Sequence, residues 1–223
     1  ALNSRWIVWP GWPNDDDDFR RAFELAKKAV LIDPFDHRNQ VNLAWSHLLM
    51  RRWELAEFHF HLAHDLNASN PETLIAYALA SSYLGNHERA VKLSQRAFQL
   101  NPLHDPQYHG YQATIAFLAG DLQGCVDAAR RSSELFPDIL GWSAAANALM
   151  GRDQQAAADF GSFLEKLANA WHDGSRPTGG MAVDWFKAAF PIRERADQEK
   201  LAAGIDRAEM LAADLGRIEF ASA

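Results

Sequence analysis

The sequence has very little cysteine: Cys125 is the single thiol among 223 residues. One thiol excludes an intramolecular disulfide and a zinc site built from cysteines, because each needs at least two. It fits a reducing compartment, and we predict a cytoplasmic protein.

Long apolar runs and an excess of basic residues are also missing. No stretch approaches the roughly 20 apolar residues that span a bilayer, and the N-terminal residues lack the pattern of a secretory signal. Acidic residues outnumber basic ones, 29 to 22, for a net charge of -7. We therefore predict neither a membrane nor nucleic acid as a direct partner. Because the chain begins at Ala1 with a tryptophan-rich stretch, we expect it to be cut from a longer polypeptide.

Motifs of catalysis are lacking as well. No glycine-rich loop precedes a Lys-Ser or Lys-Thr pair, and no Gly-x-Ser-x-Gly sequence occurs. We predict that the protein is not an enzyme and that it binds no cofactor and no metal.

What the sequence does have is an internal repeat. The segments "LIDPFD", "LNASNP" and "LNPLHD" place Pro34, Ala68 and Pro102 in equivalent positions, 34 residues apart, and Pro137 follows one residue late. Proline stops a helix because it cannot continue the hydrogen-bond ladder. Two sets of small residues recur in the same frame, as close packing between helices requires; they are Ala22, Ala56, Ala90, Cys125 and Ala156, and then Ala29, Ala63, Ala97 and Ser132.

This frame predicts helix pairs separated by short turns, where Gly85, Gly120 and Gly151 end one helix before the next begins. An incomplete pair comes first. Residues 5–13 are expected to be the remainder of its first helix and an enlarged loop, with Pro10 and Pro13 breaking the helix, and its second helix is capped by "NDDDD" (14–18). The predicted helices are 18–32, 37–50 with 54–67, 71–84 with 88–100, 105–118 with 122–135, and 139–149 with 153–169.

The repeats resemble the tetratricopeptide repeat family, most clearly in "GNHERAVKLSQRAFQLNP" (85–102). The resemblance implies an all-α, right-handed superhelical solenoid of antiparallel helix pairs. We assign residues 1–170 to these repeats and residues 171–223 to a linker and C-terminal helices. In this last region we predict helices at 181–190 and 195–215, and expect the second to cap the solenoid; the alternatives are that it fills the groove or pairs with another copy.

The order of repeats, linker and the segment 184–210 is similar to the C-terminal region of bacterial multidomain regulators that carry a nucleotide-cyclase or winged-helix domain. That likeness implies the sensor or interaction region of a larger signalling or transcriptional regulator.

Repeat folds of this kind bind partners through the inner face of the first helix of each pair. The positions expected on that face are Arg38, Val41, Asn42, Trp45, Ile75, Leu79, Ser82 and His109. Four of the eight are aromatic or aliphatic and few are cations, so we predict a protein or peptide partner with an apolar segment, which can come from other domains of the same polypeptide. A homodimer stays open, and so does a small-molecule sensor that uses the groove or the tryptophan-rich N-terminal end.

Residues 59–65, "HFHLAHD", are dense in histidine and raise the question of a metal site. The repeat frame places Phe60 and Ala63 in core positions, so the three histidines lie beside the apolar stripe. One helix supplies at most two well-placed ligands here, whereas zinc needs three or four. We therefore interpret these histidines as helix surface and inter-repeat contacts, and Cys125 as a buried packing residue.

Overall fold

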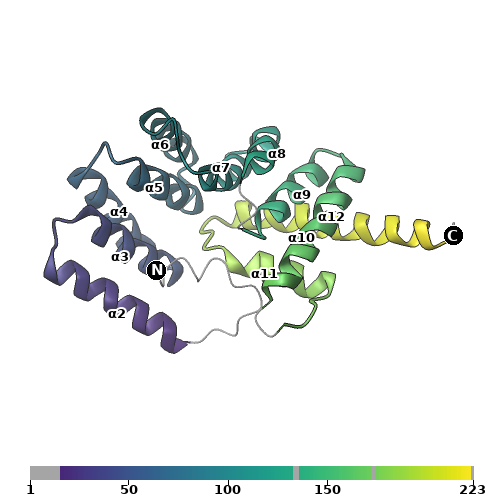
Figure 1. Ribbon diagram of the computed structural model, residues 1–223, viewed down its shortest axis with the longest axis horizontal. Helices are drawn as coiled ribbons and strands as arrows, with labels where there is room; N and C mark the ends of the chain where they lie inside the picture. Colours follow the sequence, from purple (N-terminus) through teal and green to yellow (C-terminus); the bar gives the residue numbers. More distant parts are fainter. Residues whose placement is uncertain (1–15, 133–135, 172–173, 222–223) are drawn as a thin grey trace. The chain divides into compact units, whose positions relative to one another are not determined.

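The computed structural model describes residues 16–132, 136–171 and 174–221. All regular structure in these residues is helical, which confirms the predicted fold class. Figure 1 labels the helices, and their bounds are α2 (Asp16–Ile32), α3 (His37–Leu49), α4 (Trp53–Leu66), α5 (Pro71–Tyr83), α6 (His87–Leu100), α7 (Gln107–Leu118), α8 (Leu122–Arg131), α9 (Ile139–Leu149), α10 (Asp153–Ala170), α11 (Gly179–Ala189) and α12 (Arg195–Ala221). The predicted helix remainder and loop at 5–13 lie outside the described residues.

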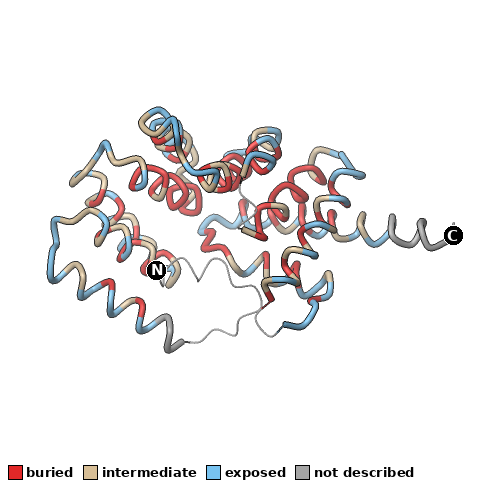
Figure 2. The backbone as a smooth tube through the Cα atoms, viewed as in Figure 1, coloured by how far each residue is buried: buried red, intermediate tan, exposed pale blue. Residues whose placement is uncertain are grey.

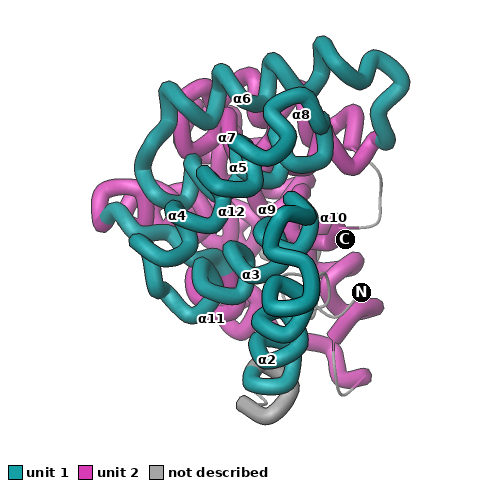
Figure 3. Tube along the Cα trace, turned by 90° about the vertical axis from the view of Figure 1, so that its left-hand side faces the viewer, with its two compact units in different colours: residues 1–7, 13–105, 190–194 teal, residues 8–12, 106–189, 195–223 magenta. Residues whose placement is uncertain are grey.

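The described residues form two compact units (Figure 3). Unit 1 contains α2 to α6 together with residues 190–194, and unit 2 contains α7 to α12 without that short segment. In unit 1, α3 pairs with α4 and α5 pairs with α6, while α2 packs on α3. In unit 2, α7 pairs with α8 and α9 pairs with α10. No helix in the described part of the chain is long and apolar enough to cross a membrane.

Four turns that join the paired helices close in the same way. The second residue after each helix adopts a left-handed conformation, with φ of 56° at Arg51, 82° at Gly85, 87° at Gly120 and 73° at Gly151. Its neighbour then donates a backbone hydrogen bond to the carbonyl five residues earlier, as Asn86 does to Ser81 at 2.9 Å and Asp121 does to Ala116 at 2.9 Å. These are Schellman closures, which satisfy helix carbonyls that have lost their intrahelical donors. Glycine suits three of the four because it has no side chain to clash at positive φ.

The core follows the predicted frame. The first small-residue set is buried throughout, and Ala63 and Ala97 of the second set are buried as well. Helices α5, α7 and α9 are buried over most of their circumference, whereas α4, α6 and α8 bury one stripe each (Figure 2). Cys125 is fully buried and its Sγ donates to the carbonyl of Trp142 at 3.7 Å, in agreement with a packing role. Burial also raises the pKa of this thiol, which keeps it in its unreactive form at neutral pH.

The C-terminal helix α12 packs against α9 and α10, the last helix pair, as expected of a capping helix. Its buried side chains Leu201, Ile205 and Ala208 lie on one face, at spacings of four and three residues. Lys200 Nζ, on the same helix, donates to the carbonyl of Leu118 at 2.8 Å.

Gly204 sets the distance between α12 and α9. A Cβ at this position would lie 2.9 Å from both the Cβ and the carbonyl oxygen of Ala145. Backbone atoms cannot move aside as a flexible side chain can, so we expect Gly204→Leu to separate the helices and cost about 1–3 kcal/mol. Thermal unfolding and limited proteolysis within α12 would measure the effect. Ala203→Leu, at the exposed neighbouring position, is the control; equal behaviour of the two variants would contradict this packing.

Candidate partner-binding surface

Four predicted residues share one face of α3, at spacings of three, four and seven residues. We call Arg38, Val41, Asn42 and Trp45 the α3 face. Arg38 and Asn42 are exposed, while Val41 and Trp45 are half-buried. The Trp45 ring meets the ring of Phe60 edge-on, with centroids 5.4 Å apart. This contact holds the indole in place while part of its surface stays in contact with solvent.

The N-terminal end of α3 is an ordered polar site. The Asp36 carboxylate accepts from the backbone N–H of Arg38 at 2.9 Å and so caps the helix. It also accepts from the Arg38 guanidinium, with Nη2 and Oδ2 2.6 Å apart. The hydrogen bonds from Arg38 lower the pKa of Asp36 from 3.8 to about 2. The carboxylate is therefore ionised at every physiological pH, and it orients the single cation of the α3 face.

The three predicted residues of α5 are placed differently. Ile75 and Leu79 are 1% and 3% exposed, and Ser82 is fully buried, with its hydroxyl donating to the carbonyl of Leu79 at 2.7 Å. One helical turn beyond Leu79, Tyr83 contacts residues 190–194, a segment that is more than 100 residues away in sequence. In this structure a partner can reach the α3 face but not these three side chains.

His109, the last predicted residue, lies on α7 in unit 2, whereas the other seven belong to unit 1. It is half-buried, and its Nδ1 lies 3.4 Å from Oε1 of Gln112 on the same helix. The structure thus brings Arg38, Val41, Asn42 and Trp45 together and leaves His109 on a separate unit.

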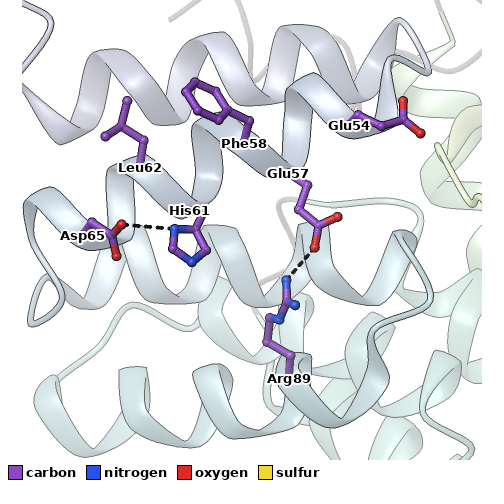
Figure 4. Close-up of a pocket in the computed structure, with 7 residues that line it drawn as sticks. All are labelled: Glu54, Glu57, Phe58, His61, Leu62, Asp65 and Arg89. Carbon is purple, nitrogen blue, oxygen red and sulfur yellow. Dashed lines mark hydrogen bonds and ion pairs between the residues drawn. The ribbon is translucent and has the colours of Figure 1, made fainter.

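Unit 1 also has an open depression of about 410 Å³ along α4, at the start of α6 (Figure 4). Glu57 and Arg89 form an ion pair across it, with Oε1 and Nη1 2.7 Å apart. The same Arg89 nitrogen donates to the Tyr77 hydroxyl at 2.9 Å, so that this cation joins α4, α5 and α6. Phe58 contributes apolar surface and is 59% exposed.

The three histidines of residues 59–65 point in different directions. His59 Nδ1 lies 2.8 Å from the Gln40 side-chain oxygen of α3, and His64 lies against the Tyr77 ring of α5. His61 is exposed, with Nδ1 3.1 Å from Oδ2 of Asp65, as Figure 4 shows. Among the described residues, no three histidine, cysteine or acidic side chains converge as a metal site.

Sequence reasoning missed a pair of stacked imidazoles between α3 and α4. The rings of His47 and His59 are nearly parallel, with centroids 5.4 Å apart, and Phe23 of α2 meets His47 edge-on at 5.2 Å. His47 is buried and its Nδ1 has no hydrogen-bond partner. Burial lowers the pKa of both histidines, that of His47 to about 4. The repeat frame could have signalled a contact between these two helices, but not which side chains would meet.

Comparisons with known proteins agree with this architecture. No family model matches the sequence. Over 106 residues the chain is 32% identical to the BBSome complex member BBS4 of Xenopus tropicalis, an alignment that covers 47% of this chain and 20% of that protein. The chain therefore spans only a small part of this relative.

Three solved structures have a similar fold. MamA matches with a TM-score of 0.52 at 18% identity, over 69% of this chain and 91% of its own. The structure of the APC/C hetero-tetramer Cut9-Hcn1 matches with a TM-score of 0.59 at 14% identity, over 84% of this chain and 40% of the matched chain. YrrB, a TPR protein with an unusual peptide-binding site, matches with a TM-score of 0.50 at 16% identity, over 88% of this chain and all of its own. At these identities the likeness shows the fold, a tetratricopeptide-type solenoid of antiparallel helix pairs.

Proposed function

We propose that this chain is a non-catalytic scaffold that binds a protein or peptide through the α3 face. The observation that carries the proposal is Trp45, a half-buried tryptophan held edge-on by Phe60 and flanked by Val41 and Asn42. Tryptophan in a fixed position supplies a large contact area at low entropic cost, and such residues dominate the energy of many interfaces. The oriented guanidinium of Arg38 adds one directional contact at the edge.

The names of similar proteins support the same class of function. They include a member of the BBSome complex, a subunit of a hetero-tetramer and a TPR protein with a peptide-binding site. An apolar partner segment with an acidic or carbonyl group for Arg38 would match the α3 face.

In its narrower form, the proposal places this chain in a bacterial signalling or transcriptional regulator located in the cytoplasm. The support is the likeness of segment 184–210 and of the domain order to such regulators. The sequence of the complete gene tests this directly, because it should encode a nucleotide-cyclase or DNA-binding domain. A complete gene without an effector domain would contradict it.

Affinity capture with the tagged chain tests the partner-binding role. We expect Arg38→Ala combined with Trp45→Ala to reduce capture of the partner at least tenfold, since interface tryptophans commonly contribute 2 kcal/mol or more. Quantitative mass spectrometry of the captured proteins would measure the loss.

A matched control is available within unit 1. Arg96 is an exposed cation on α6 and Trp53 is a half-buried tryptophan at the start of α4, and both lie outside the α3 face. Arg96→Ala combined with Trp53→Ala should keep the partner. An equal loss of partner capture in both double variants, or equal capture of the same partner by both, would contradict the assignment of binding to the α3 face. Capture of a second copy of the chain itself would favour a homodimer.

A further inference from the structure

Residues 190–194, "FPIRE", follow α11 and precede α12 in sequence, and they belong to unit 1. They are not helical, and the backbone N–H of Ile192 donates to the carbonyl of Phe190 at 2.9 Å, which closes a tight turn at Pro191. Phe190 and Ile192 are each 2% exposed, and Pro191 between them is buried. Arg193 and Glu194 are exposed. The segment thus has three apolar residues that anchor it and a charged end that faces solvent.

Two contacts join this segment to the last residue of α5. The Phe190 ring stacks on the Tyr83 ring, with centroids 6.2 Å apart and planes 21° from parallel. The backbone N–H of Arg193 donates to the Tyr83 carbonyl at 2.8 Å. Carbonyls in the last turn of a helix have no intrahelical donor, so this bond satisfies a group that the helix itself leaves open.

The turn after α5 is in contact with the same segment. A Cβ at Gly85 would lie 2.5 Å from Cγ of Glu194, whereas a Cβ at Gly120 or Gly151 would meet nothing within 4 Å. The three turns close in the same way and have similar φ values. The turn at Gly85 is therefore the one of these three that has a second chain segment packed against its glycine, and the shared turn geometry does not by itself require such a contact.

We propose that the C-terminal end of α5 is a docking site for a short aromatic-proline-aliphatic peptide with a turn at its proline, which residues 190–194 occupy in cis. A peptide in trans can supply the same ring for Tyr83 and the same backbone N–H for its carbonyl. Proline between the two anchors restricts the free peptide and lowers the entropy lost on binding. The inference rests on the proposed function, because it names a second class of partner for the same scaffold.

Occupation in cis predicts competition. A tethered segment has a high effective concentration at its own site, so a free peptide binds the intact chain weakly. The probe is a fluorescein-labelled peptide of residues 187–196, KAAFPIRERA, and the readout is fluorescence anisotropy. We expect the full chain with Phe190→Ser and Ile192→Ser to bind this peptide at least tenfold more tightly than the unaltered chain does.

Two controls separate docking from general stickiness. The full chain with Arg193→Ala and Glu194→Ala keeps the apolar anchors and should bind the peptide as weakly as the unaltered chain. The peptide KAASPSRERA lacks the anchors and should bind no variant. Equal binding of both peptides, or equal affinity of the serine variant and the unaltered chain, would overturn the proposal.

A second measurement needs no substitution. In hydrogen–deuterium exchange, excess KAAFPIRERA should increase deuterium uptake by residues 190–194 of the unaltered chain, because the free peptide displaces them. Unchanged uptake at a saturating peptide concentration would also overturn the proposal. Partner capture through Trp45 does not involve this segment. If Trp45→Ala abolishes partner capture but the peptide has no effect on the chain, only this inference is contradicted. If the peptide acts as expected but Trp45→Ala leaves partner capture unchanged, only the assignment of partner binding to the α3 face is contradicted.

Discussion

Replacing Phe60 by alanine is expected to lower the free energy of unfolding by about 3–5 kcal/mol, the usual range for removing a buried aromatic ring. Phe60 is fully buried in α4 and contacts two other rings. Trp45 meets it edge-on, and Tyr77 stacks on it with centroids 5.6 Å apart and planes 2° from parallel. The loss therefore reaches α3 and α5 as well as α4, and urea unfolding followed by circular dichroism would measure it.

Phe58 provides a matched control two residues earlier on the same helix. It is 59% exposed and lies at the open depression of α4. Phe58→Ala should change the free energy of unfolding by no more than about 0.5 kcal/mol, as is usual at the surface. Similar losses in the two variants would show that the repeat frame is displaced in this helix.

Acid should destabilise unit 1 through His47. The pKa of this histidine is about 4 in the folded chain and 6.5 as a model value, with burial as the main cause and the nearby His59 and Arg52 as further ones. Between these pH values the unfolded chain binds a proton that the folded chain does not. The stability that neutral His47 contributes is therefore complete above pH 6.5 and is lost as the pH falls toward 4, by about 3 kcal/mol in total.

The measurement has to separate His47 from Asp138. Asp138 is buried in unit 2, and burial raises its pKa from 3.8 to about 7. Its effect has the opposite sign, because the folded chain then holds a proton that the unfolded chain releases. The quantity to compare is therefore the difference between His47→Leu and the unaltered chain, in which the contribution of Asp138 cancels.

Chemical unfolding at pH 7.5 and pH 4.5 would provide that difference. We expect His47→Leu to gain about 2–3 kcal/mol relative to the unaltered chain on acidification. His61→Leu, at an exposed histidine of α4, is the comparison variant and would be measured in the same way. A pH-independent difference for His47→Leu would contradict burial of a neutral imidazole at this position.

Much of the fold could be predicted because its signals are local. The spacing of Ala56, Phe60 and Ala63 along one helix, and glycine at the turns, depends on neighbouring residues alone. Most helices lie within two residues of their predicted bounds, whereas α8 ends four residues before its predicted end and α12 six residues after it. The site was less accessible to prediction. Ile75 and Leu79 are apolar, as groove residues often are, but they are buried in the structure. The segment that contacts the end of the same helix, at Tyr83, lies more than 100 residues later in the chain. Likewise, no local pattern places His47 against His59, because their contact depends on the rotation of α3 relative to α4.

The four Schellman closures have an evolutionary consequence. Each one ends a helix and begins the next with the same backbone bonds, whichever side chains surround it. Tandem duplication or loss of 34 residues in phase would therefore create or remove a complete helix pair without leaving an unclosed helix end. The turn at Arg51 closes in the same way without glycine, so a repeat copied in phase does not depend on glycine at that position.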